Sequence, residues 1–406
     1  MRVNNDASKF DSANSSTAET CVKDGVPTIL QVLPRLETGG VERGTVDVTA
    51  AIVEAGWRAV VASGGGQMVR EVERVGGFHV TLPVFSKSPL VMRGNVKRLV
   101  KLIREHDIDI IHARSRAPAW SARAAARRTG AHFITTFHGA YNASNAVKRR
   151  YNSIMAKGER VIAISEFIAD RVISVYGAEP GRVRVIPRGV DLNIFHPSAV
   201  SPERMIQLSS EWRLPDAAPV IMLPGRLTRW KGHEVLIEAL ARLGRNDVRC
   251  ILVGAEQGHD RYRRDIDDHI ARTGVGRFVQ IVGNCRDMAA AYMLADVVVS
   301  ASTDPEAFGR VAAEAQAMGR PVIATDHGGA RETVVPGETG WLVHPGDPDA
   351  LTTALAEALA MTAEQRESMA RSAIGHVILN FSRAQMCAAT LGVYHEVLNE
   401  AAAEDV

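Results

Sequence analysis

Residues 296–318 read D-V-V-V-S-A-S-T-D-P-E-A-F-G-R-V-A-A-E-A-Q-A-M, and this stretch decides the fold of the second half of the chain. Its first five residues are typical of a buried strand, and the alanine-rich run 311–318 is typical of a helix. A strand followed by a short loop and a helix is half of a crossover unit in a parallel sheet. Glu306 lies in the loop and Glu314 in the helix, so two carboxylates flank this junction.

The same alternation of apolar runs and helical patterns continues along the whole chain. It predicts an α/β fold with two doubly wound parallel sheets, whose ligands bind beyond the carboxyl ends of the strands. In helix 95–106, for example, the apolar residues recur at helical spacing on one face. The expected strands are 28–33, 58–62, 108–113, 132–136, 160–164 and 183–187 in the first half, and 220–224, 249–253, 278–282, 296–300, 321–324 and 341–343 in the second.

Length and composition indicate a folded protein with more than one domain. The chain has 406 residues, of which 46% are hydrophobic and 23% charged. The four cysteines have no metal-ligand spacing, and no apolar run reaches the roughly 18 residues of a membrane span, which favours a reduced cytosolic protein. The expected divisions are a disordered lead-in 1–26, a first domain 27–195, a linker 196–218, a second domain 219–380 and a final helix within 381–406.

The loop after strand 220–224 reads G-R-L-T-R-W-K-G over residues 225–232. Arg226 and Lys231 can converge on one diphosphate, because arginine offers a planar fork of donors and lysine a compact point charge. The order G-x-x-x-x-G-K-[ST] of a Walker loop is missing. The alternative, which these residues alone leave open, is two solvated bases beside a turn.

The junction around Glu306 and Glu314 predicts a second part of the same site. Helix N-termini favour anions, so a diphosphate is expected at Gly309-Arg310. Glu306 can then accept hydrogen bonds from sugar hydroxyls on one side of the diphosphate, and Glu314 from ribose hydroxyls on the other. A nucleotide-sugar has this layout. The alternative is that Glu306 caps a helix and Glu314 is an ordinary surface residue.

Several motifs occur together in a specific order. They are Gly39-Gly40 with Glu42, His138-Gly139, Gly225-Arg226 with Lys231-Gly232, Glu306 with Glu314, and the stretches 163–166, 186–191, 295–296 and 328–332. As a set they resemble glycosyltransferase family 4, also called glycosyl transferases group 1, whose members are retaining enzymes with the GT-B fold. The resemblance runs from about residue 28 to 375. One departure is Arg188, which stands where the family often has asparagine and which we expect to have little effect.

The resemblance implies two Rossmann-like domains facing a central cleft, with the acceptor held mainly by the first domain and the donor by the second. It implies a last helix, about 384–401, that crosses back onto the first domain. The implied reaction transfers a sugar from a UDP- or GDP-sugar to a glycan or lipid-linked acceptor, such as a lipopolysaccharide core, with retention and with neither metal nor cofactor. The motif Asp107-Ile108-Asp109 is rejected as a metal site, because it precedes a strand rather than following one.

The resemblance also assigns roles to individual residues. The residues implied in catalysis are His138, Arg226, Lys231 and Glu306. Those implied in nucleotide-sugar binding are Gly39, Gly40, Gly225, Arg226, Lys231, Asn284, Met288, Glu306, Phe308, Gly309, Arg310 and Glu314. The base is expected against the loops 254–258 and 283–288, which do not distinguish uridine from guanosine.

A basic segment suggests the nature of the acceptor. Residues 90–160 contain 15 Lys or Arg against four acids. We expect five of these bases to line the acceptor side and to favour an anionic acceptor or an anionic membrane surface at the inner face of the membrane: Arg114, Arg116, Lys148, Arg149 and Arg150. An ordinary solvated face is the alternative. Nucleic acid is not expected, because no recognised module or aromatic interleaving accompanies the patch.

Other classes of function remain open to different degrees. A sugar-nucleotide epimerase or hydrolase on the same fold is the nearest alternative, and an inactive sugar-nucleotide receptor is another. A nicotinamide oxidoreductase does not fit, because the first loop reads T-G-G-V-E-R-G over residues 38–44 rather than G-x-G-x-x-G.

Overall fold

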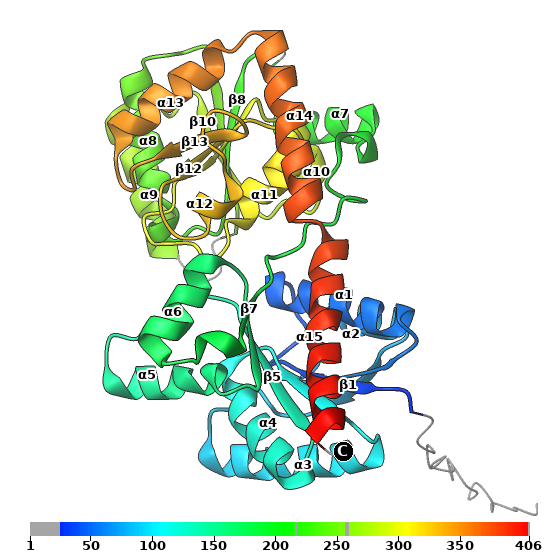
Figure 1. Ribbon diagram of the computed structural model, residues 1–406. Helices are drawn as coiled ribbons and strands as arrows, with labels where there is room; N and C mark the ends of the chain where they lie inside the picture. The colour runs from blue at the N-terminus through cyan, green and yellow to red at the C-terminus, as the bar shows by residue number, and fades with distance from the viewer. Residues whose placement is uncertain (1–24, 216, 256–259, 405–406) are drawn as a thin grey trace, which may run out of the picture.

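The computed structural model describes residues 25–215, 217–255 and 260–404, and the expected lead-in 1–26 lies almost wholly outside them. Figure 1 shows two α/β domains, the first at the bottom and the second at the top. Within the described residues the first sheet has the order β3-β2-β1-β4-β5-β6-β7 and the second β10-β9-β8-β11-β12-β13. Neighbouring strands in both sheets are parallel. The predicted α/β class with two doubly wound, Rossmann-like domains is therefore confirmed.

The strands of the first sheet are β1 (Thr28–Val32), β2 (Arg58–Ser63), β3 (Phe78–Thr81), β4 (Ile110–Ala113), β5 (His132–Phe137), β6 (Arg160–Ala163) and β7 (Val183–Val185). Those of the second are β8 (Val220–Pro224), β9 (Arg249–Val253), β10 (Val279–Val282), β11 (Val297–Ser300), β12 (Val322–Thr325) and β13 (Gly340–Val343). The helices of the first half are α1 (Gly40–Glu54), α2 (Val69–Arg74), α3 (Pro89–Glu105), α4 (Arg116–Thr129), α5 (Ala146–Asn152) and α6 (Glu166–Tyr176). The later helices are α7 (Pro202–Glu211), α8 (His233–Leu243), α9 (Asp260–Thr273), α10 (Met288–Leu294), α11 (Arg310–Ala317), α12 (Ala330–Thr333), α13 (Pro348–Ala360), α14 (Ala363–Asn380) and α15 (Arg383–Glu404).

The strands were predictable because most of them are buried on both faces. Every residue of β1 and of β8 is buried; β8 is the continuous apolar run typical of a central parallel strand, whereas β1 also buries Thr28 and Gln31. The edge strand β3 was missed, since Phe78 is 54% exposed and its neighbours are partly exposed too. The expected strand 108–113 began too early. Asp109 instead accepts a hydrogen bond from the Thr28 amide (2.8 Å) through its carboxylate, at the amino end of the sheet.

The chain passes between the domains twice, and the two passages are tied together. The amide of Val190 donates to the Phe381 carbonyl (2.7 Å), and the amide of Arg383 donates to the Val190 carbonyl (2.9 Å). The range expected as a linker, 196–218, contains α7, which buries Leu208 and Trp212 in the core of the second domain. Helix α15 then runs along the first domain (Figure 1).

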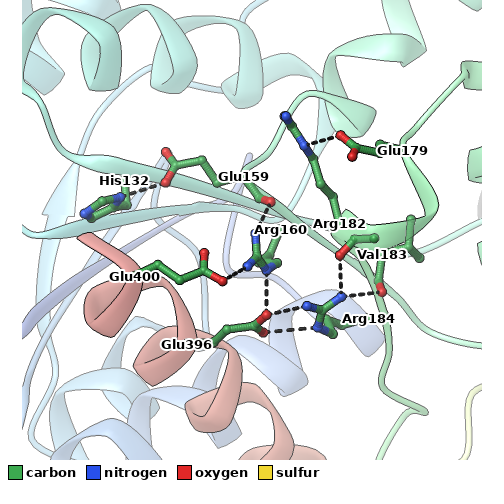
Figure 2. A network of polar contacts seen from close by, with 10 residues as sticks. His132, Glu159, Arg160, Glu179, Arg182, Val183, Arg184, Glu396 and Glu400 are labelled. Carbon is green, nitrogen blue, oxygen red and sulfur yellow. Dashed lines mark hydrogen bonds and ion pairs between the residues drawn. The ribbon is translucent and has the colours of Figure 1, made fainter. Parts of the chain in front are cut away.

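Polar contacts hold α15 on the first domain (Figure 2). Glu396 accepts from the Arg160 Nε (2.9 Å) and from the Arg184 Nε (3.1 Å), and these arginines come from the beginning of β6 and from β7. Glu400, one turn further along α15, also contacts Arg160. The hydrogen bonds from Arg184, together with those from Arg160, hold the pKa of Glu396 below its usual value. Glu396 is therefore ionised at neutral pH.

Replacing Glu396 by glutamine is expected to lower the free energy of unfolding by about 1–2 kcal/mol at pH 7, because the carboxylate charge is lost from its three charge-assisted hydrogen bonds with Arg160 and Arg184. The pKa is depressed in the folded state, so this contribution is present above the unfolded pKa and is lost as the pH falls through the folded value. Urea unfolding at pH 7 and at pH 3 measures both the loss of stability and its dependence on pH. Glu400→Gln is the control, since Glu400 is 56% exposed and should matter less. Equal losses for the two variants would contradict this account.

Candidate active site

The order of strands in the second sheet brings two distant loops together. β8 and β11 are hydrogen-bonded neighbours, although β9 and β10 lie between them in the sequence. The loops that follow these two strands therefore leave the sheet side by side, at the point where the strand order reverses. One loop carries Lys231 and the other carries Glu306.

Lys231 and Glu306 form a nearly buried ion pair. The Lys231 Nζ lies 2.6 Å from the Glu306 Oε1, and the side chains are 12% and 13% exposed. The Ser302 hydroxyl donates to the same oxygen (2.5 Å). Burial raises the pKa of Glu306, but attraction to Lys231 and the hydrogen bonds from Lys231 and Ser302 outweigh burial, so the net pKa lies below the usual value. The site thus holds a carboxylate and an ammonium in fixed positions.

A glycine makes this close approach of the two loops possible. Gly232 has a left-handed backbone (φ 74°) and follows directly on Lys231. A Cβ at Gly232 would lie 1.8 Å from the carbonyl oxygen of Ala301, in the loop after β11. Any side chain would push the loops apart, so glycine at this position places Lys231 against Glu306.

Glu314 lies one turn into α11 and is also held by two partners. The Arg310 Nε donates to the Glu314 Oε1 (2.6 Å), and the Tyr292 hydroxyl donates to the Oε2 (3.0 Å). Arg310 also reaches the first domain, where its Nη1 lies 3.3 Å from the position of a Cβ on Gly40. The beginning of α11, at Gly309 and Arg310, therefore faces the Gly39-Gly40 loop, as a ligand bound by both would require.

His138 follows β5 and is partly buried, with both ring nitrogens shielded from solvent. Neither ring nitrogen has a hydrogen-bond partner within the described parts of the chain. Burial lowers the pKa of His138 well below its usual value, and the charges of Arg188 and Arg114 lower it further. The imidazole is therefore neutral at neutral pH, so one of its nitrogens can donate a hydrogen bond to a ligand and the other can accept one.

Two residues predicted for the site are placed differently by the structure. Arg226 is exposed, and in the described residues its guanidinium makes no hydrogen bond or ion pair, so the protein itself does not fix its position as it fixes that of Lys231. The Phe308 ring is 5% exposed and packs edge to face on Phe381 (5.4 Å between ring centroids) in the apolar core shared by the two domains. The Phe308 ring is therefore not available to contact the donor. Only its backbone can face a ligand.

The loop after β10, predicted to contact the base, borders a cavity of about 620 Å³. Asn284 is exposed there, and Arg204 of α7 closes one side through its pair with Asp287 (2.6 Å). Met288 begins α10 and packs on the core of the second domain instead of lining this cavity. Of the second predicted base loop, 254–258, residues 256–258 lie outside the described residues.

The five bases predicted to form one acceptor patch do not form one. Arg114 is 3% exposed and donates to the Gln31 side chain (2.9 Å), so it is not part of an exposed patch with the others. The Arg116 guanidinium stacks over Tyr141, 3.9 Å from the ring centroid. The other three, Lys148, Arg149 and Arg150, are exposed together on α5.

Two residues at the boundary between the domains make contacts that the sequence did not predict. Both carboxylate oxygens of Glu332 accept from the amides that begin α6, those of Glu166 (2.8 Å) and Phe167 (2.9 Å). Arg188 lies over α1 and donates to the Gly40 carbonyl, although we expected this departure from the family to have little effect. Only folding reveals these contacts, because the partners are 166, 165 and 148 positions apart.

Comparison with known proteins agrees with this geometry. The family model "Glycosyl transferases group 1" matches residues 206–376, and "Glycosyltransferase Family 4" matches residues 38–194. A crystal structure of a glycosyltransferase from Rickettsia africae ESF-5 is 38% identical with a TM-score of 0.86, over 92% of this chain and 99% of that one. The chain belongs to glycosyltransferase family 4.

Two further relatives of this family 4 chain carry more specific names. The structure of Anabaena Alr3699/HepE in complex with UDP-glucose is 25% identical with a TM-score of 0.78, over 90% of this chain and 99% of that one. The D-inositol 3-phosphate glycosyltransferase of Xylanimonas cellulosilytica is 35% identical over 210 residues, which are 51% of this chain. The match spans only about half, 50%, of that curated relative.

Membrane-spanning helices and metal-ligand clusters are both absent from the described residues. No described helix is both long and apolar enough to span a membrane. Across the described ranges, no group of three or more His, Cys, Asp or Glu side chains is arranged to hold a metal ion.

Proposed function

We propose that this protein is a retaining glycosyltransferase that moves a sugar from a nucleotide-sugar to a glycan or lipid-linked acceptor. The observation that carries the proposal is the Lys231–Glu306 pair beside the beginning of α11, with Glu314 one turn further on. A cation and a helix N-terminus suit a diphosphate, and the flanking carboxylates suit the hydroxyls on each side of it. The UDP-glucose complex of the Anabaena relative supports this class of donor.

In the proposed reaction the bond between the sugar C1 and the diphosphate oxygen breaks, and negative charge grows on the diphosphate. Lys231, joined by Arg226 when the donor is bound, stabilises that charge, and a fixed cation does so without reorganising during the reaction. The acceptor oxygen bonds to C1 on the face that the leaving group departs from. The acceptor's hydroxyl proton passes to the departing phosphate oxygen, so the reaction needs no carboxylate nucleophile, metal or cofactor.

The other side chains position the sugar and the ribose. Among the described residues all hydrogen bonds to the Glu306 carboxylate go to its Oε1, which leaves the Oε2 for a sugar hydroxyl. Each oxygen of Glu314 keeps a free lone pair for a ribose hydroxyl. Neutral His138 can donate to one oxygen of the donor sugar and accept from another hydroxyl.

The donor is identified by a thermal-shift screen of UDP, GDP, ADP and their sugars. One nucleotide is expected to raise the melting temperature, by an amount that follows its concentration relative to its Kd. The Glu314→Ala variant should lose most of that shift, because its carboxylate is proposed to hold the ribose. A protein that no nucleotide stabilises would not be a nucleotide-sugar enzyme. Incubating the preferred sugar nucleotide without acceptor tests the alternative, since an epimerase converts it alone.

For the acceptor we propose an anionic glycolipid, such as a lipopolysaccharide core, reached at the inner face of a membrane. The exposed bases of α5 support this, together with Val147 beside them, which is 78% exposed. The relative named for D-inositol 3-phosphate, a phosphorylated compound, is consistent with an anionic acceptor.

The membrane part of this proposal predicts that the protein sediments with anionic vesicles at low salt and much less with neutral ones. Replacing Lys148, Arg149 and Arg150 by glutamine should remove most of that binding, because each base near the surface contributes about 1 kcal/mol. The matched control replaces Lys97, Lys101 and Arg104, three exposed bases of α3, by glutamine and changes the net charge equally. Equal sedimentation with both kinds of vesicle would remove the membrane from the proposal.

A further inference from the structure

Two guanidinium groups from different domains meet at one glycine. The Arg310 Nη1, from α11 of the second domain, lies 3.3 Å from the position of a Cβ on Gly40, and the Arg188 Nη2, from the loop after β7, lies 3.9 Å from it. Both terminal nitrogens of Arg188 lie 2.6 Å from the position of a Cβ on Gly44. Arg188 can therefore lie on α1 only because residue 44 has no side chain.

The positive charge here is poorly matched by acids. Arg310 pairs with Glu314, but Arg188 donates to the backbone carbonyl of Gly40, which is uncharged. Behind them Arg114 donates to the amide oxygen of Gln31, and its buried Nε has no partner within the described residues. Asp47 is the buried carboxylate that faces this cluster, and it is also 4.0 Å from Arg383.

Polar groups without partners point to a ligand at this place. His138, whose two ring nitrogens have no partner among the described residues, lies close enough to Arg188 and Arg114 for their charges to act on it. Burial and the charges of Arg114 and Arg310 lower the pKa of Arg188 to about 9, and the charge of Asp47 opposes this only in part. A bound dianion would balance the charges of Arg188 and Arg310 at Gly40.

We propose that Arg188 and Arg310 bind a phosphate group of the acceptor against Gly40, an inference that rests on the proposed function. A phosphate carries up to two charges and several acceptor oxygens, which two guanidinium forks can bind together. The donor diphosphate has its own cation at Lys231 and the backbone amides at the beginning of α11, which leaves the Arg310 guanidinium for a second anion. Arg188, Arg114 and His138 all follow strands of the first sheet, the side assigned to the acceptor.

The experiment measures inorganic phosphate binding to the full chain, by thermal shift, in the presence of a saturating concentration of the nucleoside diphosphate that stabilises it most. Phosphate is expected to bind the nucleotide-saturated protein. Arg188→Asn, which introduces the residue frequent in the family, should weaken phosphate binding about tenfold or more while leaving nucleotide binding unchanged. Arg188→Lys should keep part of the phosphate affinity, and Arg127→Asn, an exposed arginine of α4, should keep all of it.

Three results would overturn the proposal. The first is that phosphate does not bind the nucleotide-saturated protein. The second is that Arg188→Asn binds phosphate as tightly as the unmodified protein. The third is that Arg188→Asn loses nucleotide affinity, which would assign the arginine to the donor instead. If no nucleotide binds the unmodified protein, the proposed function fails. In that case the anion site is still tested by comparing phosphate binding to the unmodified protein and to Arg188→Asn, both without nucleotide. Arg188→Lys preserves the charge and guards against an effect of misfolding alone.

Discussion

Replacing Lys231 by alanine is expected to lower kcat by about 10²–10³, the range found when one fixed stabiliser of transition-state charge is removed. Lys231 is the cation that the structure holds in place before any ligand arrives, by its 2.6 Å contact with Glu306 and by the glycine that follows it. The loss should appear in kcat with a smaller change in KM, because the charge on the diphosphate grows as the bond breaks. Steady-state kinetics with the donor found by the nucleotide screen measures both.

The control for this substitution addresses stability. Lys231→Ala leaves Glu306 buried without its partner, which can destabilise the fold by itself. The double variant Lys231→Met/Glu306→Gln removes both charges, so it should melt close to the unmodified protein and still be inactive. The sequence predicts a loss in the same range for Arg226→Ala. Losses below tenfold for both Lys231→Ala and Arg226→Ala would exclude a diphosphate site made by this loop.

Replacing Gly254 by alanine is expected to destabilise the second domain by at least about 3 kcal/mol, in the range of severe overpacking. A Cβ at Gly254 would lie 1.8 Å from the carbonyl oxygen of Gly225. The two glycines follow directly on the adjacent strands β9 and β8, so the clash is with backbone rather than with a side chain that could turn away. The clash can be relieved only if the loop that begins at Gly225 moves, and that loop carries Arg226 and Lys231. The variant should therefore express poorly or melt much earlier, and any folded fraction should bind nucleotide weakly.

The matched control is Gly283→Ala at the end of the neighbouring strand β10. A Cβ at Gly283 would meet nothing within 4 Å. This variant should melt within a few degrees of the unmodified protein. If both variants melt at the same temperature, the backbones of the two loops are not packed as closely as described.

The fold was predictable from sequence because it depends on local patterns. A buried strand such as β8 is apolar throughout, and that pattern identifies a parallel sheet without knowledge of its partners. The pairing of Arg310 with Glu314 was also within reach, since residues four apart on a helix face each other. The family resemblance supplied the rest of the site that was anticipated.

What the sequence could not reveal depends on contacts between distant segments. Arg114 looked like a surface base because it lies in a basic segment, yet the fold buries it against Gln31, 83 positions away. Arg188 was dismissed as a neutral departure, and its contact with Gly40 spans 148 positions. Phe308 stood beside the site residues in the sequence, but its ring turns into the shared core. In each case tertiary packing decided the side chain's surroundings, and no local periodicity encodes packing.

The two backbone hydrogen bonds between Val190 and the junction of α14 with α15 have a mechanical consequence. Two domains joined by two separate linking segments can slide or twist relative to each other in several ways. When the two segments are hydrogen-bonded to each other at one point, the motion that remains is chiefly a rotation about that point. Entry of substrate and departure of product then share a single pivot, which lies at Phe381 and Ser382 rather than among the ligand-binding groups. Turnover in this protein is thus open to tuning from a position that no substrate touches.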